Sequence, residues 1–200
     1  MSKVGIEALN FYGGLACLDV RTLFQARGLS IERFDNLMMQ SKSVSLPCED
    51  PVTNAVNAAR PIVDQLTEAE KNSIELVITA TESGMDFGKS LSTYVHDYLG
   101  LSRNCRLFEV KQACYGGTAA LHMAASHIAA NRSAYAKALV IATDTARASM
   151  KMEYFEPTQA AGAVALLVSR KPQILELDLG ANGYYSYEVM DACRPDPEIE

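Results

Sequence analysis

The order of apolar and polar positions along the chain predicts an α/β protein. Short apolar runs indicate buried strands, and the runs at 74–81 (IELVITAT) and 138–143 (ALVIAT) are the clearest. Segments with helical spacing of apolar residues lie between such runs. Strands that alternate with helices predict a mostly parallel sheet covered by helices. The expected strands are 4–9, 74–81, 106–111, 138–143, 163–169 and 174–179, and the expected helices are 19–27, 31–37, 51–66, 89–99 and 115–131.

Prolines add detail to two of these segments. Pro51 suits the first turn of the 51–66 helix, whereas Pro61 is expected to kink that helix or to split it. The tight link through Lys171 and Pro172 predicts a hairpin that joins the last two strands.

Length, composition and charge narrow the class of protein. The 200 residues are enough for one domain with a sizeable core, and 48% hydrophobic with 21% charged residues is ordinary for a globular protein. The net charge of -6 argues against a nucleic-acid partner. No apolar run reaches the roughly 18–20 residues that span a membrane, and no signal peptide follows Met1. We therefore expect a cytoplasmic protein with neither a nucleic-acid nor a membrane partner.

The cysteines indicate a reducing compartment. Their number is odd and they form no CxxC pair, so neither a disulfide framework nor a metal site is expected. Free cysteines in such a protein are mostly small buried hydrophobes. The five are Cys17, Cys48, Cys105, Cys114 and Cys193.

Cys114 differs from the others in its position between a predicted strand and a predicted helix. The first turn of a helix carries partial positive charge and unpaired N–H groups, which favour a thiolate and can stabilise an oxyanion. Gly116 and Gly117 are expected to let a thioester substrate come close. From the residues alone, an inert buried thiol is an equally good interpretation.

Glu82 is the candidate acid/base. It directly follows the 74–81 strand, and parallel neighbouring strands would bring it to the same edge of the sheet as Cys114. A carboxylate there can remove a proton from the α-carbon of a thioester. The alternative is an acid that only stabilises a helix N-terminus.

Four motifs, taken in order and spacing, resemble the 3-hydroxy-3-methylglutaryl (HMG) synthase family over nearly the whole chain. The first is TESG, which contains Glu82, and the second is KQACYGGTAAL, which contains Cys114. The third is IATD, which ends at Asp144, and the fourth is EPTQAAGAVA, which contains Thr158 and Gly162. The second is the most specific of the four.

The resemblance implies a fold and a reaction. The fold is the thiolase-like fold, an αβαβα arrangement of two similar halves, and residues 1–200 resemble its N-terminal half. Cys114 carries an acetyl group, and Glu82 removes a proton from it so that the carbanion attacks the β-keto carbon of a second thioester. The assembly is a homodimer. Metal and resident cofactors are not implied, since the phosphopantetheine thioester of an acyl carrier protein, or of CoA, is the substrate carrier.

The resemblance also places further residues at the site. The substrate-binding candidates are Tyr115, Gly116, Asp144, Thr158, Gly162 and Asp191. Ala192 follows Asp191 where ordinary HMG-CoA synthases have an aromatic residue. Family members also use a histidine from the second half, and none of this chain's histidines substitutes for it. His122, for example, is eight residues along the helix from Cys114, about 12 Å away at the helical rise.

Within the family, segments such as 33–39 (RFDNLMM) and 87–94 (FGKSLSTY) look most like the polyketide β-branching synthases. These use donor and acceptor acyl carrier proteins as partners. The first alternative is a mevalonate-pathway HMG-CoA synthase that uses acetyl-CoA and acetoacetyl-CoA. An alternative of another class is a non-catalytic half that docks a carrier protein, and a β-ketoacyl synthase III-like condensing enzyme is a lesser one.

The last ten residues, 191–200 (DACRPDPEIE), are polar and contain no closing element. We expect them to be a loop that leads into a C-terminal half outside these 200 residues.

Overall fold

The structure is a computed structural model that describes residues 3–145 and 156–188. Within these ranges, the centre is a six-stranded sheet in the order β5-β4-β6-β7-β1-β8. The α/β class expected from the sequence is confirmed. The strands of this sheet are β1 (Gly5–Tyr12), β4 (Ile74–Ala80), β5 (Arg106–Val110), β6 (Lys137–Thr145), β7 (Ala161–Ser169) and β8 (Leu175–Glu176).

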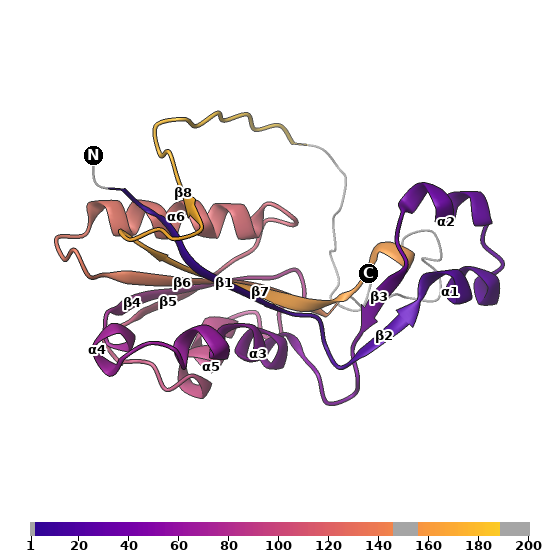
Figure 1. Cartoon of the computed structure of the whole chain (residues 1–200), viewed down its shortest axis with the longest axis horizontal. Helices are drawn as coiled ribbons and strands as arrows, with labels where there is room; N and C mark the ends of the chain where they lie inside the picture. The colour runs from indigo at the N-terminus through magenta and orange to yellow at the C-terminus, as the bar shows by residue number, and fades with distance from the viewer. Residues whose placement is uncertain (1–2, 146–155, 189–200) are drawn as a thin grey trace.

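Helices cover both faces of the sheet. Helix α6 (Gly116–Ala130) lies on one face, and α3 (Pro51–Val63) and α5 (Leu91–Tyr98) lie on the other, with the short α4 (Glu68–Lys71) beside them (Figure 1). Each face has its own apolar core. This double coverage explains why β4 and β6 are apolar at successive positions.

The sheet is mixed, and the prediction of a mostly parallel sheet is wrong. Strand β4 pairs in parallel with β5 and β6, but β7 is antiparallel to both β6 and β1. An apolar run looks the same in a buried parallel strand and a buried antiparallel one, so the pattern could not show the direction of β7.

The predicted hairpin between the last two strands is also wrong. Strand β1 lies between β7 and β8, and β8 pairs with β1 alone. The backbone N–H groups of Gln173 and Ile174 both donate to the Ile6 carbonyl, which turns the chain onto β1. Gly5 permits this approach, because a Cβ on it would lie 2.0 Å from the Leu175 carbonyl oxygen.

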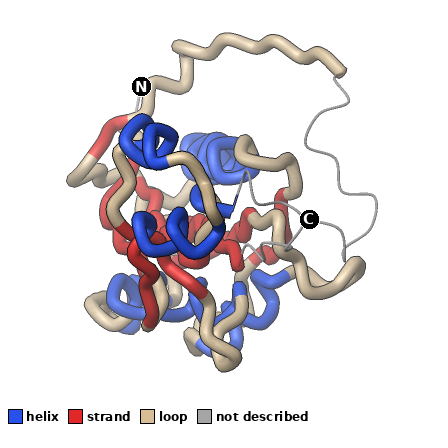
Figure 2. Tube along the Cα trace, turned by 90° about the vertical axis from the view of Figure 1, so that its right-hand side faces the viewer, coloured by secondary structure: helices blue, strands red, loops and turns tan. Residues whose placement is uncertain are grey.

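A small lobe, residues 13–48, projects from one end of the sheet (Figure 1), the end that faces the viewer in Figure 2. It contains the antiparallel pair β2 (Ala16–Asp19) and β3 (Ser41–Val44), and the helices α1 (Val20–Arg27) and α2 (Ile31–Leu37). Arg27 joins it to Glu156 through two hydrogen bonds of 2.9 Å. The sequence predicted both helices of the lobe but neither strand.

Helix ends follow local chemistry. The Asp19 carboxylate caps α1 by accepting from the Thr22 N–H, and this bond lowers the pKa of Asp19. Pro51 is in the first turn of α3, as predicted. The helix continues through Pro61 but ends at Val63, three residues before the predicted end. Gly100 follows α5 with a left-handed φ of +61°.

Helix α6 is buried along one side only. Its residues are small and apolar on nearly every face, a pattern that is typical of an enclosed helix. Its buried residues are Gly116, Ala120, Ala124, Ala125 and Ile128, whereas Met123 is 47% exposed. At its C-terminal end, the Arg170 guanidinium donates to the carbonyls of Ile128, Ala129 and Asn131.

Candidate functional site

Cys114 lies in the turn between β5 and α6, as the sequence predicted, and its side chain is exposed. The turn is tight: the N–H groups of Tyr115 and Gly116 donate to the carbonyls of Gln112 and Ala113 at 3.0 Å. Ala113 adopts a φ of +40°, a left-handed conformation that L residues rarely adopt. The backbone before Cys114 is therefore strained, which is common where a structure holds a functional side chain in place.

These hydrogen bonds change the expected source of oxyanion donors. The N–H groups of Tyr115 and Gly116 are already engaged within the turn. The first i→i−4 bond runs from the Ala119 N–H to the Tyr115 carbonyl, so the N–H groups of Gly117 and Thr118 have no partner inside the helix. Donors for an oxyanion are therefore one turn farther into α6 than the cysteine.

Glu82 meets Cys114 at the carboxyl edge of the sheet. It follows β4, and β4 and β5 are parallel neighbours. The Cys114 thiol donates to Glu82 Oε1, with 3.7 Å between sulfur and oxygen. The two residues that the sequence placed at one edge are thus in contact, and a half-buried carboxylate lies beside an exposed thiol at a helix N-terminus.

Asp144 holds the loop that carries Glu82. Its Oδ1 accepts from Thr81 Oγ1 (3.0 Å), from the N–H groups of Glu82 (2.8 Å) and Ser83 (3.0 Å), and from Ser83 Oγ (2.9 Å). Ser83 Oγ in turn accepts from the Thr145 N–H. One carboxylate oxygen at the end of β6 therefore fixes the backbone on both sides of the Glu82 Cα. Sequence reasoning did not identify Ser83, whose only signal was its place in the TESG motif.

The other candidates are spread around this contact. Tyr115 is next to the cysteine and 54% exposed. Gly116 is buried, and a Cβ on it would contact Ala80 Cβ and the Val110 carbonyl at 3.5 Å. It therefore lies against the sheet, and its expected contact with a substrate stays a prediction.

The two candidates of the EPTQAAGAVA motif, Thr158 and Gly162, lie in different environments. Thr158 is exposed in a short 3-10 helix (Glu156–Thr158). Gly162 pairs with Asp144 in the sheet, and a Cβ on it would lie 2.8 Å from the Tyr12 carbonyl oxygen. The structure thus gives Gly162 a packing role at the strand that carries Asp144. Asp191 and Cys193 lie outside the described residues.

Glu109 is a second acid that the sequence analysis passed over. Its Oε2 accepts from the Leu91 N–H at 2.8 Å and lies 3.4 Å from Thr79 Oγ1. It therefore anchors the first turn of α5, where the loop from Glu82 ends. Its position in the middle of an apolar strand was the signal that could have identified it.

The remaining described cysteines have different surroundings. Burial raises the pKa of the Cys105 thiol to about 11, which makes its thiolate scarce near neutral pH. Cys17 and Cys48 are exposed, but Cys17 lies on β2 and Cys48 in the turn after β3, both in the lobe. Among the described cysteines, Cys114 is the one whose thiol donates a hydrogen bond to a carboxylate side chain, whereas the Cys105 thiol donates to a backbone carbonyl.

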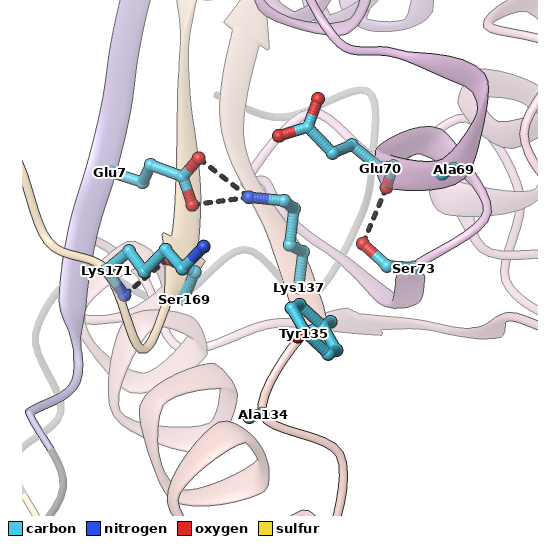
Figure 3. Close-up of a pocket in the computed structure, with 9 residues that line it drawn as sticks. All are labelled: Glu7, Ala69, Glu70, Ser73, Ala134, Tyr135, Lys137, Ser169 and Lys171. Atoms are coloured by element: carbon cyan, nitrogen blue, oxygen red, sulfur yellow. Dashed lines mark hydrogen bonds and ion pairs between the residues drawn. The ribbon is translucent and has the colours of Figure 1, made fainter.

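A separate cavity of about 150 Å³ lies at the opposite end of the sheet (Figure 3). It opens where β4 and β6 begin, and the ion pair between Lys137 and Glu7 lines it. Among the described residues, no group of three or more His, Cys, Asp or Glu side chains could hold a metal ion. No helix in the same ranges is long and apolar enough to cross a membrane.

Comparison with known proteins decides the family. A family model described as "Hydroxymethylglutaryl-coenzyme A synthase N terminal" matches residues 1–173. The chain belongs to the HMG-CoA synthase family. The resemblance seen in the motifs is confirmed, and so is the expected fold class, the N-terminal half of a thiolase-like HMG synthase.

Relatives from both branches of the HMG-CoA synthase family match. The polyketide biosynthesis 3-hydroxy-3-methylglutaryl-ACP synthase PksG of Bacillus subtilis (strain 168) is 58% identical over 100% of this chain and 50% of that protein. A hydroxymethylglutaryl-CoA synthase of Enterococcus faecalis is 36% identical over 96% of this chain and 49% of that protein. The chain spans about half the length of these relatives.

A solved structure gives the same result. The curacin biosynthetic pathway HMG synthase, in complex with acetyl donor-ACP, matches with a TM-score of 0.93 and 62% identity over 97% of this chain and 48% of that one. Because the two chains agree in both backbone and sequence, the described half has the fold of an HMG synthase.

Proposed function

We propose that this chain is the N-terminal half of an acyltransferase that builds HMG-type β-branches on polyketide chains. The observation that carries the proposal is the 3.7 Å contact between Cys114 and Glu82 at the start of α6. A non-catalytic docking half would need neither side chain at this edge. The identity of 58% to a polyketide HMG-ACP synthase, against 36% to an HMG-CoA synthase, favours carrier-protein substrates over CoA esters.

In the first step, the Cys114 sulfur attacks the carbonyl carbon of an acetyl thioester on a donor acyl carrier protein. The thiol proton passes to Glu82, the positive end of the α6 dipole stabilises the developing negative charge, and the donor carbon–sulfur bond breaks. The departing phosphopantetheine sulfur takes the proton from Glu82. Cys114 then carries the acetyl group and Glu82 is ionised again.

In the second step, Glu82 removes a proton from the acetyl methyl group. The electron pair of that C–H bond forms a C–C bond to the β-keto carbon of an acyl chain on an acceptor carrier protein. The keto oxygen takes a proton, which we assign to the histidine that the family resemblance places in the second half. Water then cleaves the Cys114 thioester, and the product has a β-hydroxy group and a β-carboxymethyl branch.

The proposal includes a homodimer with a second half that completes each site, and a cytoplasmic location. The loop clamp on Asp144 gives this acid a positioning role, in place of the direct substrate contact expected from the sequence.

Replacement of Glu82 by Gln in the full-length enzyme tests the mechanism. We expect Cys114 still to become acetylated from acetyl-carrier protein, although more slowly, because its sulfur remains exposed at the helix N-terminus. Condensation with a β-ketoacyl-carrier protein should fall by roughly 10²- to 10⁴-fold, the usual contribution of a general base. The two steps are measured by intact mass and by product formation. Condensation at the unmodified rate in Glu82→Gln would rule out Glu82 as the base.

A further inference from the structure

A fully buried asparagine lies beneath the end of β6. Asn54 belongs to α3 and has 0% exposure. Its Nδ2 donates to the Asp144 carbonyl oxygen at 3.4 Å, while its Oδ1 has no partner among the described residues. A buried amide oxygen without a partner is unfavourable, and an apolar side chain would avoid that cost. We therefore expect that the functional group of Asn54 at this position is its N–H donor, which binds the Asp144 carbonyl.

The last residues of β6 are paired with a strand on one side only, so the hydrogen bond from Asn54 supports them on another side. Strand β4 stops at Ala80, which is opposite Ala142, two residues before Asp144. Beyond that point, β7 is the strand that still pairs with β6. Helix α3 holds the end of β6 through two hydrogen bonds. Thr143 Oγ1 donates to the Pro51 carbonyl at 2.7 Å, and Asn54 donates to the Asp144 carbonyl.

From the end of β6, the contacts continue to the base. The Asp144 carboxylate receives the N–H groups of both Glu82 and Ser83, so a shift of the Asp144 backbone moves the loop that carries Glu82. Since proton transfer from a methyl group depends steeply on geometry, a displacement of about 1 Å is enough to slow it.

We propose that Asn54 is a positioning residue for the Glu82 carboxylate, acting through Asp144. This inference rests on the proposed function, in which Glu82 removes the methyl proton. It predicts that the proton-transfer step, and not the folding of the protein, is what depends on the Asn54 N–H group.

The test compares three variants of the full-length enzyme. Asn54→Leu has the same number of side-chain heavy atoms, removes the donor and also removes the unpaired oxygen. Because leucine has the larger volume, the free energy of unfolding of this variant is measured beside that of the unmodified enzyme. Asn54→Ala removes the donor without adding apolar bulk. Asn10→Ala is the matched control, because Asn10 Nδ2 donates to the Ala58 carbonyl at 2.8 Å and so ties β1 to the same helix α3, away from Asp144.

Acetylation of Cys114 and condensation are measured separately, with acetyl- and trideuterioacetyl-carrier protein as donors. We expect both Asn54 variants to slow condensation by at least roughly tenfold, and acetylation by no more than about twofold, because the exposed thiol can also exchange its proton with solvent whereas the methyl group depends on Glu82. The deuterium isotope effect on condensation should increase, because proton removal becomes more strongly rate-limiting. Asn10→Ala should leave unchanged both the ratio of the condensation rate to the acetylation rate and the isotope effect on condensation.

Each other outcome is informative. Equal slowing of both steps, or an unchanged isotope effect in Asn54→Leu, would overturn the positioning role and leave Asn54 as a packing residue. If both Asn54 variants condense at the unmodified rate, the Asn54 proposal fails while the proposed function stands. If the unmodified enzyme neither acetylates Cys114 nor condenses, the proposed function itself fails.

Discussion

At the scale of single residues, the two acids of the site differ in what they face. Glu82 directs an oxygen to the Cys114 sulfur, whereas Asp144 directs one to backbone N–H groups. A carboxylate that accepts several hydrogen bonds is firmly held and fixes its donors in turn. Asp144 therefore fixes the loop that carries Glu82, the proposed base.

Replacing Asp144 with Ala should release the loop that carries Glu82. We expect condensation to fall by about 10- to 100-fold because the base loses its fixed position, with Cys114 acetylation affected less. Rates of the two steps by rapid quench give the comparison. Asp178→Ala is the control, since Asp178 Oδ1 accepts from Gly180 N–H in a distant turn. Equal effects of the two variants would contradict the assigned role.

The buried Cys105 thiol should make the stability of the protein depend on alkaline pH. Burial disfavours the thiolate and raises the pKa of Cys105 in the folded protein from the ordinary thiol value of 9.0 to about 11. The unfolded thiol therefore ionises first, so this contribution to stability is fully present below pH 9 and is lost as the pH rises toward 11. Urea unfolding at several alkaline pH values should show a smaller loss of stability for Cys105→Ala. An identical loss in both proteins would show that Cys105 does not contribute.

Cys114 and Glu82 could be placed at one edge of the sheet from the sequence because each lies in the turn after an apolar strand, and parallel strands bring such turns together. Their chemical roles were predicted from the family motifs and not from this position. The clamp on Asp144 could not be predicted, because a residue's place after a strand does not reveal which donors its side chain meets. The buried state of Gly116 depends on how closely α6 approaches Ala80, which is a property of the packing.

At the scale of elements, a buried ion pair links two strands that are far apart in sequence. Lys137 at the start of β6 lies within 2.6–2.7 Å of both oxygens of Glu7 on β1, beside the cavity of Figure 3. Lys137 is 6% exposed. Such a pair fixes the register of the strands, because its members cannot separate without leaving a buried charge.

Glu7→Gln should therefore destabilise the protein by about 3 kcal/mol, since Lys137 would remain buried without its counter-ion. Chemical denaturation measures this loss. The matched control is Glu176→Gln, which breaks the exposed pair between Lys3 and Glu176 and should change stability very little. If the two variants are equally stable, the buried pair does not stabilise the fold.

The elements themselves were easier to predict than their arrangement. The helix from 31 to 37 is observed at the predicted bounds, since its apolar spacing is local. The insertion of β1 between β7 and β8 depends on contacts between residues more than 160 positions apart, such as Gly5 with Ser169 and with Glu176. Strands β2 and β3 have four residues each and no clear alternation, so no local signal marked them.

At the scale of the whole molecule, α6 and the adjoining strands have exposed apolar side chains on the same side of the sheet. Phe11 is 72% exposed, Met123 47% and Val164 40%. The chain spans about half the length of its relatives, and the proposed second half would cover this side.

Hydroxyl-radical footprinting of the full-length enzyme tests this coverage. We expect low oxidation at Met123 and Phe11, because an exposed apolar surface of this kind marks an interface and the proposed second half would shield it from solvent. Met38, which is 90% exposed in the lobe, is the internal reference and should be oxidised rapidly. Oxidation of Met123 as fast as that of Met38 would contradict the proposed position of the second half.

The central claim is that Cys114 accepts an acetyl group from a carrier protein. Intact-protein mass spectrometry of the full-length enzyme tests it most directly, with acetyl-carrier protein or acetyl-CoA as the donor and Cys114→Ala as the control. The account predicts an added mass of about 42 Da, the mass that a thioester-bound acetyl group adds. This adduct should form efficiently from the carrier protein, weakly from acetyl-CoA, and not in the variant. Efficient loading from acetyl-CoA would favour a CoA-dependent synthase, and no adduct from either donor would contradict the mechanism.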